Sequence, residues 1–445
     1  MSTSPARGWE AVPELIASIA QPCIPATTFD IRDHAKDDEL AQDCRPAIER
    51  ALRCAADGSG GRIIIPPGTW YCGGPIHLRS HCELHLMEGA VLRFSPHPED
   101  YLPQVLTRWE GTECFNYSPL IYAYMAEDVA ITGSGTIDGN ATDGFGDWRP
   151  QQNPGKKRLR QMGAEGTPVF QRVFGDGDFL RPSMIQFLSC TRTCVEGVRI
   201  IDSPFWVIHL VSSAHCQVRK VQVDSQRLNN DGVDVESCSS VLIEDNHFIT
   251  GDDSIVIKSG RDADGWRLGR PSQDIVIRNN TMTGHNALAI GSEMSGGVRR
   301  VYMQDNRLLD VRGALYFKGN PDRGGTIEDV WMRRIQVDRC EKPLIQFRSN
   351  YQGVEQGPYP PRFHHITIED VQVEHCGQLL HLNGTQQQPI DTIVIARVHA
   401  KQSWLHGDAL EQALVVDCQR CHVRNLRLED VSLQGHAIQV LPAAT

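Results

Sequence analysis

Three aspartates in the middle of this chain have the chemistry needed for acid–base catalysis. Asp231 lies in the sequence Asn-Asn-Asp, and Asp252 and Asp253 lie in the sequence Gly-Asp-Asp. Cleavage of a glycosidic bond needs one protonated carboxyl group that donates to the leaving oxygen, and one ionised carboxylate that activates water or attacks the sugar. Repulsion among converging carboxylates raises the proton affinity of at least one of them. The three aspartates would therefore supply both roles if the fold brings them together.

Basic and polar side chains surround these aspartates in the sequence. His285 lies in Gly-His-Asn and Lys318 in Tyr-Phe-Lys, and both would counter the charge of a uronic-acid sugar. We expect Asn229, Tyr316 and Lys258 to be further substrate contacts. A single cluster of this kind is typical of a solvated turn, but four clusters in this order favour a shared site.

A repeat of short apolar triplets, each followed by a polar turn rich in Asn and Asp, organises the chain. Alternation of apolar and polar residues over three to five positions indicates strands, because successive side chains point to opposite faces of a sheet. A recurrence of about 20–40 residues is the signature of a solenoid, and no long helical pattern separates the triplets. The sequence therefore predicts an all-β parallel β-helix. The triplets include residues 198–200, 241–243, 275–277, 301–303, 330–332, 366–368 and 393–395.

A solenoid would bring the chemical residues together. Because consecutive turns stack about 4.8 Å apart, residues one repeat apart in sequence become neighbours on one face. We therefore expect Asp231, Asp252, Asp253, His285 and Lys318 to converge in one groove.

One helix and one insertion interrupt the strand pattern. Residues 43–56 carry apolar residues on one face and are followed by Gly58, so we predict a helix that caps the open N-terminal end of the solenoid. Residues 140–182 contain Gly, Pro and a basic run, and we predict a long loop beside the groove. We expect residues 1–27 to be an N-terminal extension and residues 28–445 to be a single β-helix domain.

Composition limits the partners. The formal net charge is −11, from 44 Lys and Arg against 55 Asp and Glu, which argues against nucleic acid or an anionic membrane. An anionic sugar polymer would then need a local basic patch. No run of about 18 apolar residues occurs. No secretory signal is visible, so we expect a cytoplasmic protein, or a periplasmic or secreted one if a leader has been removed.

The cysteines predict neither a disulfide framework nor a metal site. The 14 cysteines are scattered along the chain, as expected of buried thiols. Cys418 and Cys421, and Cys190 and Cys194, have metal-like spacing, but neither pair has an obvious second pair of ligands nearby in sequence. We expect no metal and no cofactor.

The four motifs resemble those of glycoside hydrolase family 28, the polygalacturonases, whose motifs are Asn-Thr-Asp, Gly-Asp-Asp, Gly-His-Gly and Arg-Ile-Lys. The resemblance extends from about residue 28 to residue 433, and residues 291–297 look like the bacterial and plant exo-acting branch. It implies a right-handed parallel β-helix that hydrolyses an anionic pectic poly- or oligosaccharide. Further resemblance lies in residues 117–122 and 203–206.

The resemblance also implies roles for individual residues. Asp252 corresponds to the general acid, and Asp231 and Asp253 to the residues that activate the attacking water, with inversion at the anomeric carbon. His285 corresponds to a histidine that supports the protonation of the acid or binds substrate. Lys318 corresponds to the lysine that contacts the uronate carboxylate.

Two positions depart from the family pattern. Asn286 replaces the second glycine of Gly-His-Gly and narrows the backbone freedom beside His285. Tyr316 replaces the arginine of Arg-Ile-Lys and cannot reproduce a bidentate carboxylate contact. A subsite at Tyr316 would then accept a neutral or decorated sugar, unless Arg323 swings in to replace the missing charge.

Three alternative functions stay open at this stage. A family member of this kind can be specific for a modified pectin such as rhamnogalacturonan or xylogalacturonan. A calcium-dependent β-helical lyase would instead show clustered calcium carboxylates and an arginine base. A non-catalytic carbohydrate-binding β-helix would not need three converging carboxylates.

Overall fold

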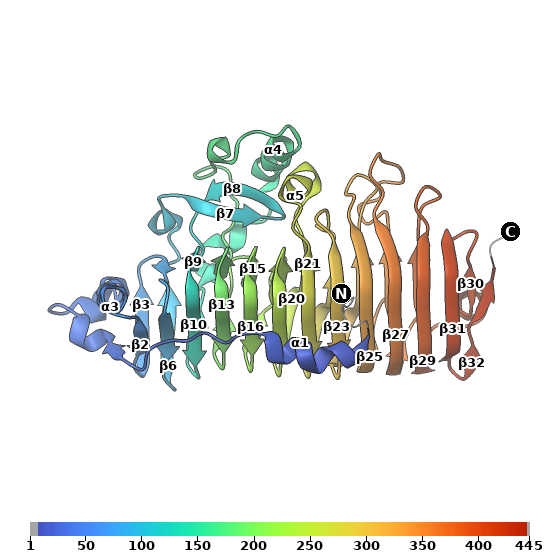
Figure 1. The fold of residues 1–445 in the computed structure, drawn as a ribbon, viewed down its shortest axis with the longest axis horizontal. Coiled ribbons are helices and arrows are strands. Elements are labelled where there is room, and N and C mark those ends of the chain that lie inside the picture. Colours follow the sequence, from blue (N-terminus) through green and yellow to red (C-terminus); the bar gives the residue numbers. More distant parts are fainter. Residues whose placement is uncertain (1–7, 443–445) are drawn as a thin grey trace, which may run out of the picture. The chain divides into compact units, whose positions relative to one another are not determined.

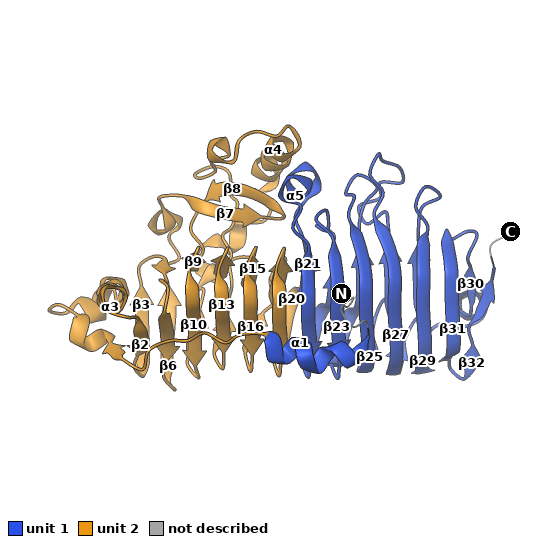
Figure 2. Cartoon of the chain, in the orientation of Figure 1, with its two compact units in different colours: residues 1–18, 253–445 blue, residues 19–252 orange. Residues whose placement is uncertain are grey.

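The computed structural model describes residues 8–442, which divide into two compact units (Figure 2). We call residues 19–252 the N-terminal unit, and residues 1–18 together with 253–445 the C-terminal unit. Strand β20 (His247–Lys258) contains the boundary between them. The single β-helix domain expected for residues 28–445 stays a prediction.

Parallel strands build the N-terminal unit, and successive turns of the chain add strands to three columns (Figure 1). The first column contains β4 (Ile76–His77), β9 (Ile121–Tyr124), β12 (Ile185–Leu188), β15 (Ile208–Val211) and β18 (Val233–Glu236). The second contains β2 (Gly61–Ile65), β5 (Cys82–Leu86), β10 (Glu127–Gly133), β13 (Thr191–Glu196), β16 (Ala214–Arg219) and β19 (Ser239–Glu244), with β1 (Thr28–Asp30) at its start. The third contains β3 (Gly68–Cys72), β6 (Ala90–Phe94), β11 (Thr136–Asp138), β14 (Arg199–Ile201), β17 (Gln222–Ser225) and the start of β20.

Longer parallel strands build the C-terminal unit. One column contains β21 (Ser272–Arg278), β23 (Val298–Gln304), β25 (Thr326–Cys340), β27 (Arg362–Cys376), β29 (Ile390–Gln402) and β31 (Val423–Leu433). Beside it, β22 (Thr281–Ile290) pairs with β24 (Arg307–Lys318). Strand β24 serves two columns, since its first half pairs with β25 and its second half pairs with β26 (Ile345–Arg348), which pairs in turn with β28 (Leu380–Asn383).

The apolar triplets of the sequence form the interiors of these stacks. In the C-terminal unit Ile275, Val301, Val330, Ile366 and Ile393 are successive register partners and are fully buried. Each turn therefore buries its apolar residues against the next turn, as expected for a solenoid. The alternation of the triplets correctly predicted strands.

Left-handed backbone conformations mark the bends between strands. Asp305 has a φ of 58°, which Asp and Asn tolerate better than other residues with a side chain. The following Asn306 is buried, accepts from the backbone N–H of Asn280 at 3.1 Å and donates to the carbonyl of Ile277 at 3.1 Å. Polar turn residues thus satisfy backbone groups of the preceding turn.

The predicted capping helix is confirmed. Helix α3 (Arg45–Asp57) ends at Gly58 and lies at the start of the N-terminal unit, where it contacts β1, β2 and β4 (Figure 1). Its apolar face is buried through Ala47, Ile48, Ala51, Leu52 and Ala55. This face covers apolar side chains that the first turn of the stack would otherwise expose.

The prediction for residues 140–182 was incomplete, because this segment contains a helix rather than only a loop. Helix α4 (Asn153–Ala164) packs near an antiparallel hairpin of β7 (Val105–Trp109) and β8 (Thr112–Asn116). Trp109 stacks on Phe205 with ring centroids 5.3 Å apart. Three cations of the basic run on α4 pair with acids of the same unit, Lys156 and Arg160 with Glu110 and Arg158 with Asp178.

The described part of the first 18 residues packs on the C-terminal unit. Helix α1 (Val12–Ser18) contacts β21, and Nε1 of Trp9 donates to Glu369 at 2.8 Å. All 14 cysteines are free thiols. Among residues 8–442, no helix is long and apolar enough to cross a membrane.

Candidate active site

The loop that carries Asp231 in the N-terminal unit is held by a buried arginine. Arg181 donates through Nη2 to Oδ1 of Asn229 at 2.8 Å and through Nη1 to the carbonyl of Leu228 at 3.1 Å. Burial lowers the pKa of Arg181 to about 10, against the opposing effect of negative groups that include Asp231. Sequence reasoning missed Arg181, because nothing in its sequence neighbourhood marks it. Asn229, expected as a substrate contact, thus accepts a hydrogen bond inside the protein.

The next residue, Asn230, fixes the backbone beside Asp231. Asn230 is fully buried, and its amide donates to the carbonyls of Ser203 and Phe205 at 3.0 and 2.8 Å. The backbone carbonyl of Asp231 accepts from the N–H of Val207 at 2.8 Å. Only 3% of Asp231 is exposed. The Ser-Pro-Phe-Trp segment noted in the sequence is therefore the support on which the Asp231 turn rests.

Asp252 differs from Asp231 in its access to solvent. It lies on β20 and is half-buried, whereas Asp231 is almost fully enclosed. The hydroxyl of Thr250 donates to the backbone carbonyl of Asp252 at 2.9 Å, which fixes the main chain at this point. A partly exposed carboxyl group suits a residue that must exchange protons.

In the C-terminal unit, Asp253 is the centre of a buried ion pair. Nζ of Lys318 lies 2.6 Å from its Oδ2, and Nδ2 of Asn286 donates to its Oδ1 at 2.7 Å. Burial alone would raise the pKa of Asp253. The charges of Lys318 and Lys258 and the hydrogen bonds from Lys318 and Asn286 outweigh that effect, so the pKa lies below its ordinary value. Asp253 is therefore ionised at neutral pH.

Asn286 has a role that the sequence did not suggest. It pairs in register with Gly313 on the next turn. A β-carbon at residue 313 would lie 2.5 Å from Oδ1 of Asn286, so glycine there makes room for the amide. The substitution in the Gly-His-Gly motif thus gives Asp253 a hydrogen-bond donor, rather than only restricting the backbone beside His285.

His285 contacts an arginine of the following turn. Nη1 of Arg312 lies 2.8 Å from Nε2 of His285. Because a guanidinium only donates, Nε2 must accept, and the neutral imidazole makes this contact. The fixed positive charge at this position therefore belongs to Arg312.

Tyr316 supports Lys318 instead of presenting an open face. Only 4% of Tyr316 is exposed, and its ring packs with Val256, Ala289 and Tyr351. Nζ of Lys318 lies 5.3 Å from the ring centroids of both Tyr316 and Tyr351, within the range of cation–π attraction. This placement favours an indirect effect of Tyr316 on substrate over direct stacking against a sugar.

Arg323 does not replace the missing arginine in this structure. It is fully buried, its Nε donates to Asp262 at 2.6 Å, and its Nη1 donates to the carbonyl of Ser292. Nearby, Lys258 and Arg261 pair with Glu293 at 3.4 and 2.8 Å. Arg323 is therefore part of an internal network, and the expectation that it contacts substrate has no support in its position.

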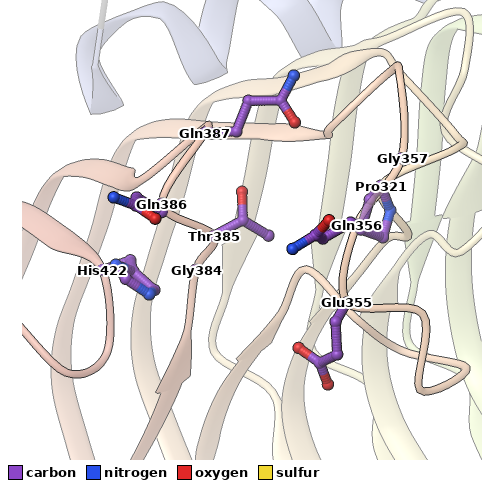
Figure 3. A pocket seen from close by; sticks show the side chains of 9 residues that line it. All are labelled: Pro321, Glu355, Gln356, Gly357, Gly384, Thr385, Gln386, Gln387 and His422. Atoms are coloured by element: carbon purple, nitrogen blue, oxygen red, sulfur yellow. The ribbon is translucent and has the colours of Figure 1, made fainter.

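A pocket of about 740 Å³ lies near the end of β28 in the C-terminal unit (Figure 3). Residues 384–387, which directly follow the last residue of that strand, form part of its lining. Within the described chain, none of the nine lining residues is a lysine or an arginine. The pocket therefore suits hydroxyl groups better than carboxylates. Its polar side chains are Glu355, Gln356, Thr385, Gln386, Gln387 and His422.

Comparison with known proteins identifies the family. The sequence pattern of "Glycosyl hydrolases family 28" matches residues 112–399. A probable polygalacturonase from Vitis vinifera is 27% identical over 366 residues, which cover 79% of this chain and 69% of that protein. An exo-poly-alpha-D-galacturonosidase from Dickeya chrysanthemi is 24% identical over 359 residues, covering 74% of this chain and 59% of that protein.

Solved structures agree with this result. A hyperthermoactive exopolygalacturonase from Thermotoga maritima matches with a TM-score of 0.86 and 36% identity, over 95% of this chain and 96% of that chain. The fold is a right-handed parallel β-helix, as the sequence predicted. The chain belongs to glycoside hydrolase family 28 and is a glycoside hydrolase.

Proposed function

We propose that this enzyme hydrolyses galacturonate-containing pectic chains, with inversion and from the chain ends. The observation that carries the proposal is the buried Asp253 carboxylate, held ionised by Lys318 and directly following the more exposed Asp252. One carboxylate is thus kept as a base while its neighbour can exchange protons. The pectic substrate is inferred from the names of the matched relatives.

In the proposed mechanism, Asp252 donates a proton to the leaving glycosidic oxygen, and Asp231 and Asp253 activate the attacking water. Lys318 has three N–H donors, so it can hold Asp253 and a substrate carboxylate at the same time. Inversion places the attacking water on the face of the sugar opposite the leaving oxygen, so the configuration of the first product distinguishes it from retention.

The proposed attack from chain ends has two lines of support. The Thermotoga maritima and Dickeya chrysanthemi relatives are both named as exo-acting. The insertion that carries α4 is the second, because insertions of this kind commonly shape a binding site and would restrict it to chain ends. Hydrolysis should then release small sugars stepwise. A rapid fall in polymer viscosity before much reducing sugar appears would contradict exo-action.

Reducing-sugar release tests the reaction itself. Polygalacturonate, rhamnogalacturonan and xylogalacturonan would each be incubated with the enzyme, with and without a chelator. We expect release from polygalacturonate that survives chelation. Unsaturated products that need calcium would indicate a lyase, release only from a modified pectin would change the substrate, and no product would indicate a carbohydrate-binding protein.

A further inference from the structure

Arg348 lies one turn beyond Lys318 in the C-terminal unit. It is the last residue of β26, its register partner on the preceding turn is Lys318, and its partner on the following turn is Asn383. Because adjacent strands are about 4.8 Å apart, Arg348 stands one strand spacing along the stack from the lysine that binds Asp253.

The side chains of β26 show that Arg348 projects from the same face of the strands as Lys318. Phe347 points into the core, where its ring stacks on Phe317 with centroids 4.2 Å apart. Side chains alternate along a strand, so Gln346 and Arg348 project from the opposite face. By the same alternation around Phe317, this is also the face of Lys318.

Two cations in this part of the chain, Arg348 on β26 and Lys342 just before it, have no acidic partner. Neither the Arg348 guanidinium nor the Lys342 ammonium makes a hydrogen bond or ion pair with any residue from 8 to 442. Arg348 is only half-buried, but its Nε is enclosed and unpartnered. Nε2 of Gln346, on a side chain that is 4% exposed, also lacks an acceptor among those residues. The Arg348 guanidinium, the Lys342 ammonium and the Gln346 amide are thus three hydrogen-bond donors, close together in sequence, that have no acceptor among the described residues.

The positive charge at this position is not balanced. The pKa of Lys342 is lowered first by burial and then by the charges of Arg312 and Arg348, with a smaller contribution from Lys318. Only Glu341 acts in the opposite direction. A bound anion would relieve this repulsion, because an opposite charge within about 4–6 Å favours the charged form of each group.

We propose that Arg348, together with Lys342 and Gln346, forms a second uronate subsite, one turn beyond the sugar held by Lys318. Guanidinium and carboxylate match in a bidentate geometry, and the amide of Gln346 can donate to a ring hydroxyl. The subsite takes the carboxylate of the third sugar of a chain whose first two sugars flank the cleaved bond. This inference rests on the proposed function.

The test compares four proteins, the wild type and three variants, on substrates of two lengths, trigalacturonate and digalacturonate. Arg348→Gln removes the charge, Arg348→Lys keeps it, and Arg339→Gln is the matched control, because Arg339 is an exposed arginine paired with Asp310 at 2.9 Å. On trigalacturonate, Arg348→Gln should lower kcat/KM about 10-fold or more, mainly through KM, as expected for loss of a hydrogen bond to a charged group. Arg348→Lys should lose less, and Arg339→Gln should match the wild type.

Digalacturonate separates binding at the subsite from a general defect. The dimer does not reach Arg348, so all four proteins should cleave it equally. If Arg348→Gln behaves like Arg339→Gln on the trimer, or loses equally on both substrates while its thermal unfolding is unchanged, the second subsite is wrong although the proposed function stands. If the wild type cleaves neither oligomer, the proposed function fails and the subsite fails with it. Should Arg348→Gln not fold, the same comparison is made with Lys342→Gln.

Discussion

Two rows of cations in the C-terminal unit differ in what they contact. At backbone bends of left-handed conformation, within or between strands, Arg300 pairs with Asp274 and Arg334 pairs with Asp305, each at 2.6 Å and each with an aspartate of the preceding turn. On the face of β24 and β26, Lys318 binds the buried Asp253, while Arg348 pairs with nothing among the residues described. Each of these cations at a bend has an acidic partner, which the stacking of one turn on the next places beside it. Cations left unmatched on the strand face are the ones available to a ligand.

The two rows of cations should also differ in how much their ion pairs contribute to the free energy of unfolding. A partly exposed ion pair contributes about 0–1 kcal/mol, because water screens it and side-chain entropy opposes it. A buried carboxylate such as Asp253, which is 1% exposed, would be left uncompensated without its lysine. Loss of one partner of a buried pair typically costs about 3–5 kcal/mol. The bend row should therefore tolerate substitution, whereas loss of Lys318, the strand-face cation in a buried pair, should not be tolerated.

The largest expected effect is that of Asp252→Asn. If Asp252 is the proton donor, turnover should fall about 10²–10⁴-fold, the usual contribution of general acid catalysis. Binding of trigalacturonate, measured by calorimetry, should stay nearly unchanged. Near-normal turnover in this variant would remove Asp252 from the mechanism.

Lys318→Met should change the pH profile as well as the rate. In the wild type, the pKa of Asp253 lies below its ordinary value, so the carboxylate is ionised at neutral pH and its contribution is lost only as the pH falls through that low value. Without Lys318, burial raises the pKa, and the acid limb of kcat/KM should move to higher pH. An unchanged acid limb would show that Asp253 does not govern it. Circular dichroism would show whether the variant is folded.

Asn286→Gly should have a similar but smaller effect. It restores the family's glycine and removes the hydrogen bond to Oδ1 of Asp253, while the Lys318 pair remains. The acid limb should shift in the same direction as in Lys318→Met, by less. Gly313→Ala provides a second way to disturb the same contact, because the added methyl group would meet Oδ1 of Asn286. Identical pH profiles in wild type and Asn286→Gly would reduce Asn286 to a packing role.

Arg334→Gln should have the smallest effect. The pair with Asp305 is partly exposed, so its loss should lower the free energy of unfolding by at most about 1 kcal/mol. The kinetics on trigalacturonate should be unchanged. A loss of activity comparable with that of Arg348→Gln would mean that matched and unmatched cations do not differ in function.

Much of the fold could be predicted from sequence because strand alternation and repeat length are local patterns. The triplets became strands, and the helix expected at residues 43–56 is α3, Arg45–Asp57. Helix α4 was missed, since its Gly and Pro residues are typical of loops and its burial depends on distant side chains such as Glu110.

The sequence motifs predicted which residues belong to the candidate site, but not the contacts that these residues make. The contact of Asn286 with Asp253 depends on the register between turns, which the sequence does not contain. Arg348 was missed for a related reason. In sequence it looks like any other arginine, and only the absence of a partner within the described structure distinguishes it from Arg300 or Arg334.

The most direct test of the proposed mechanism is the configuration of the first product. Proton NMR recorded during the first minutes of trigalacturonate hydrolysis would show which anomer forms before mutarotation. A water molecule activated by ionised Asp253 and protonation by Asp252 predict a product with inverted configuration at the anomeric carbon. A product that first appears with retained configuration would contradict the account, because it would require a covalent intermediate with one of these carboxylates.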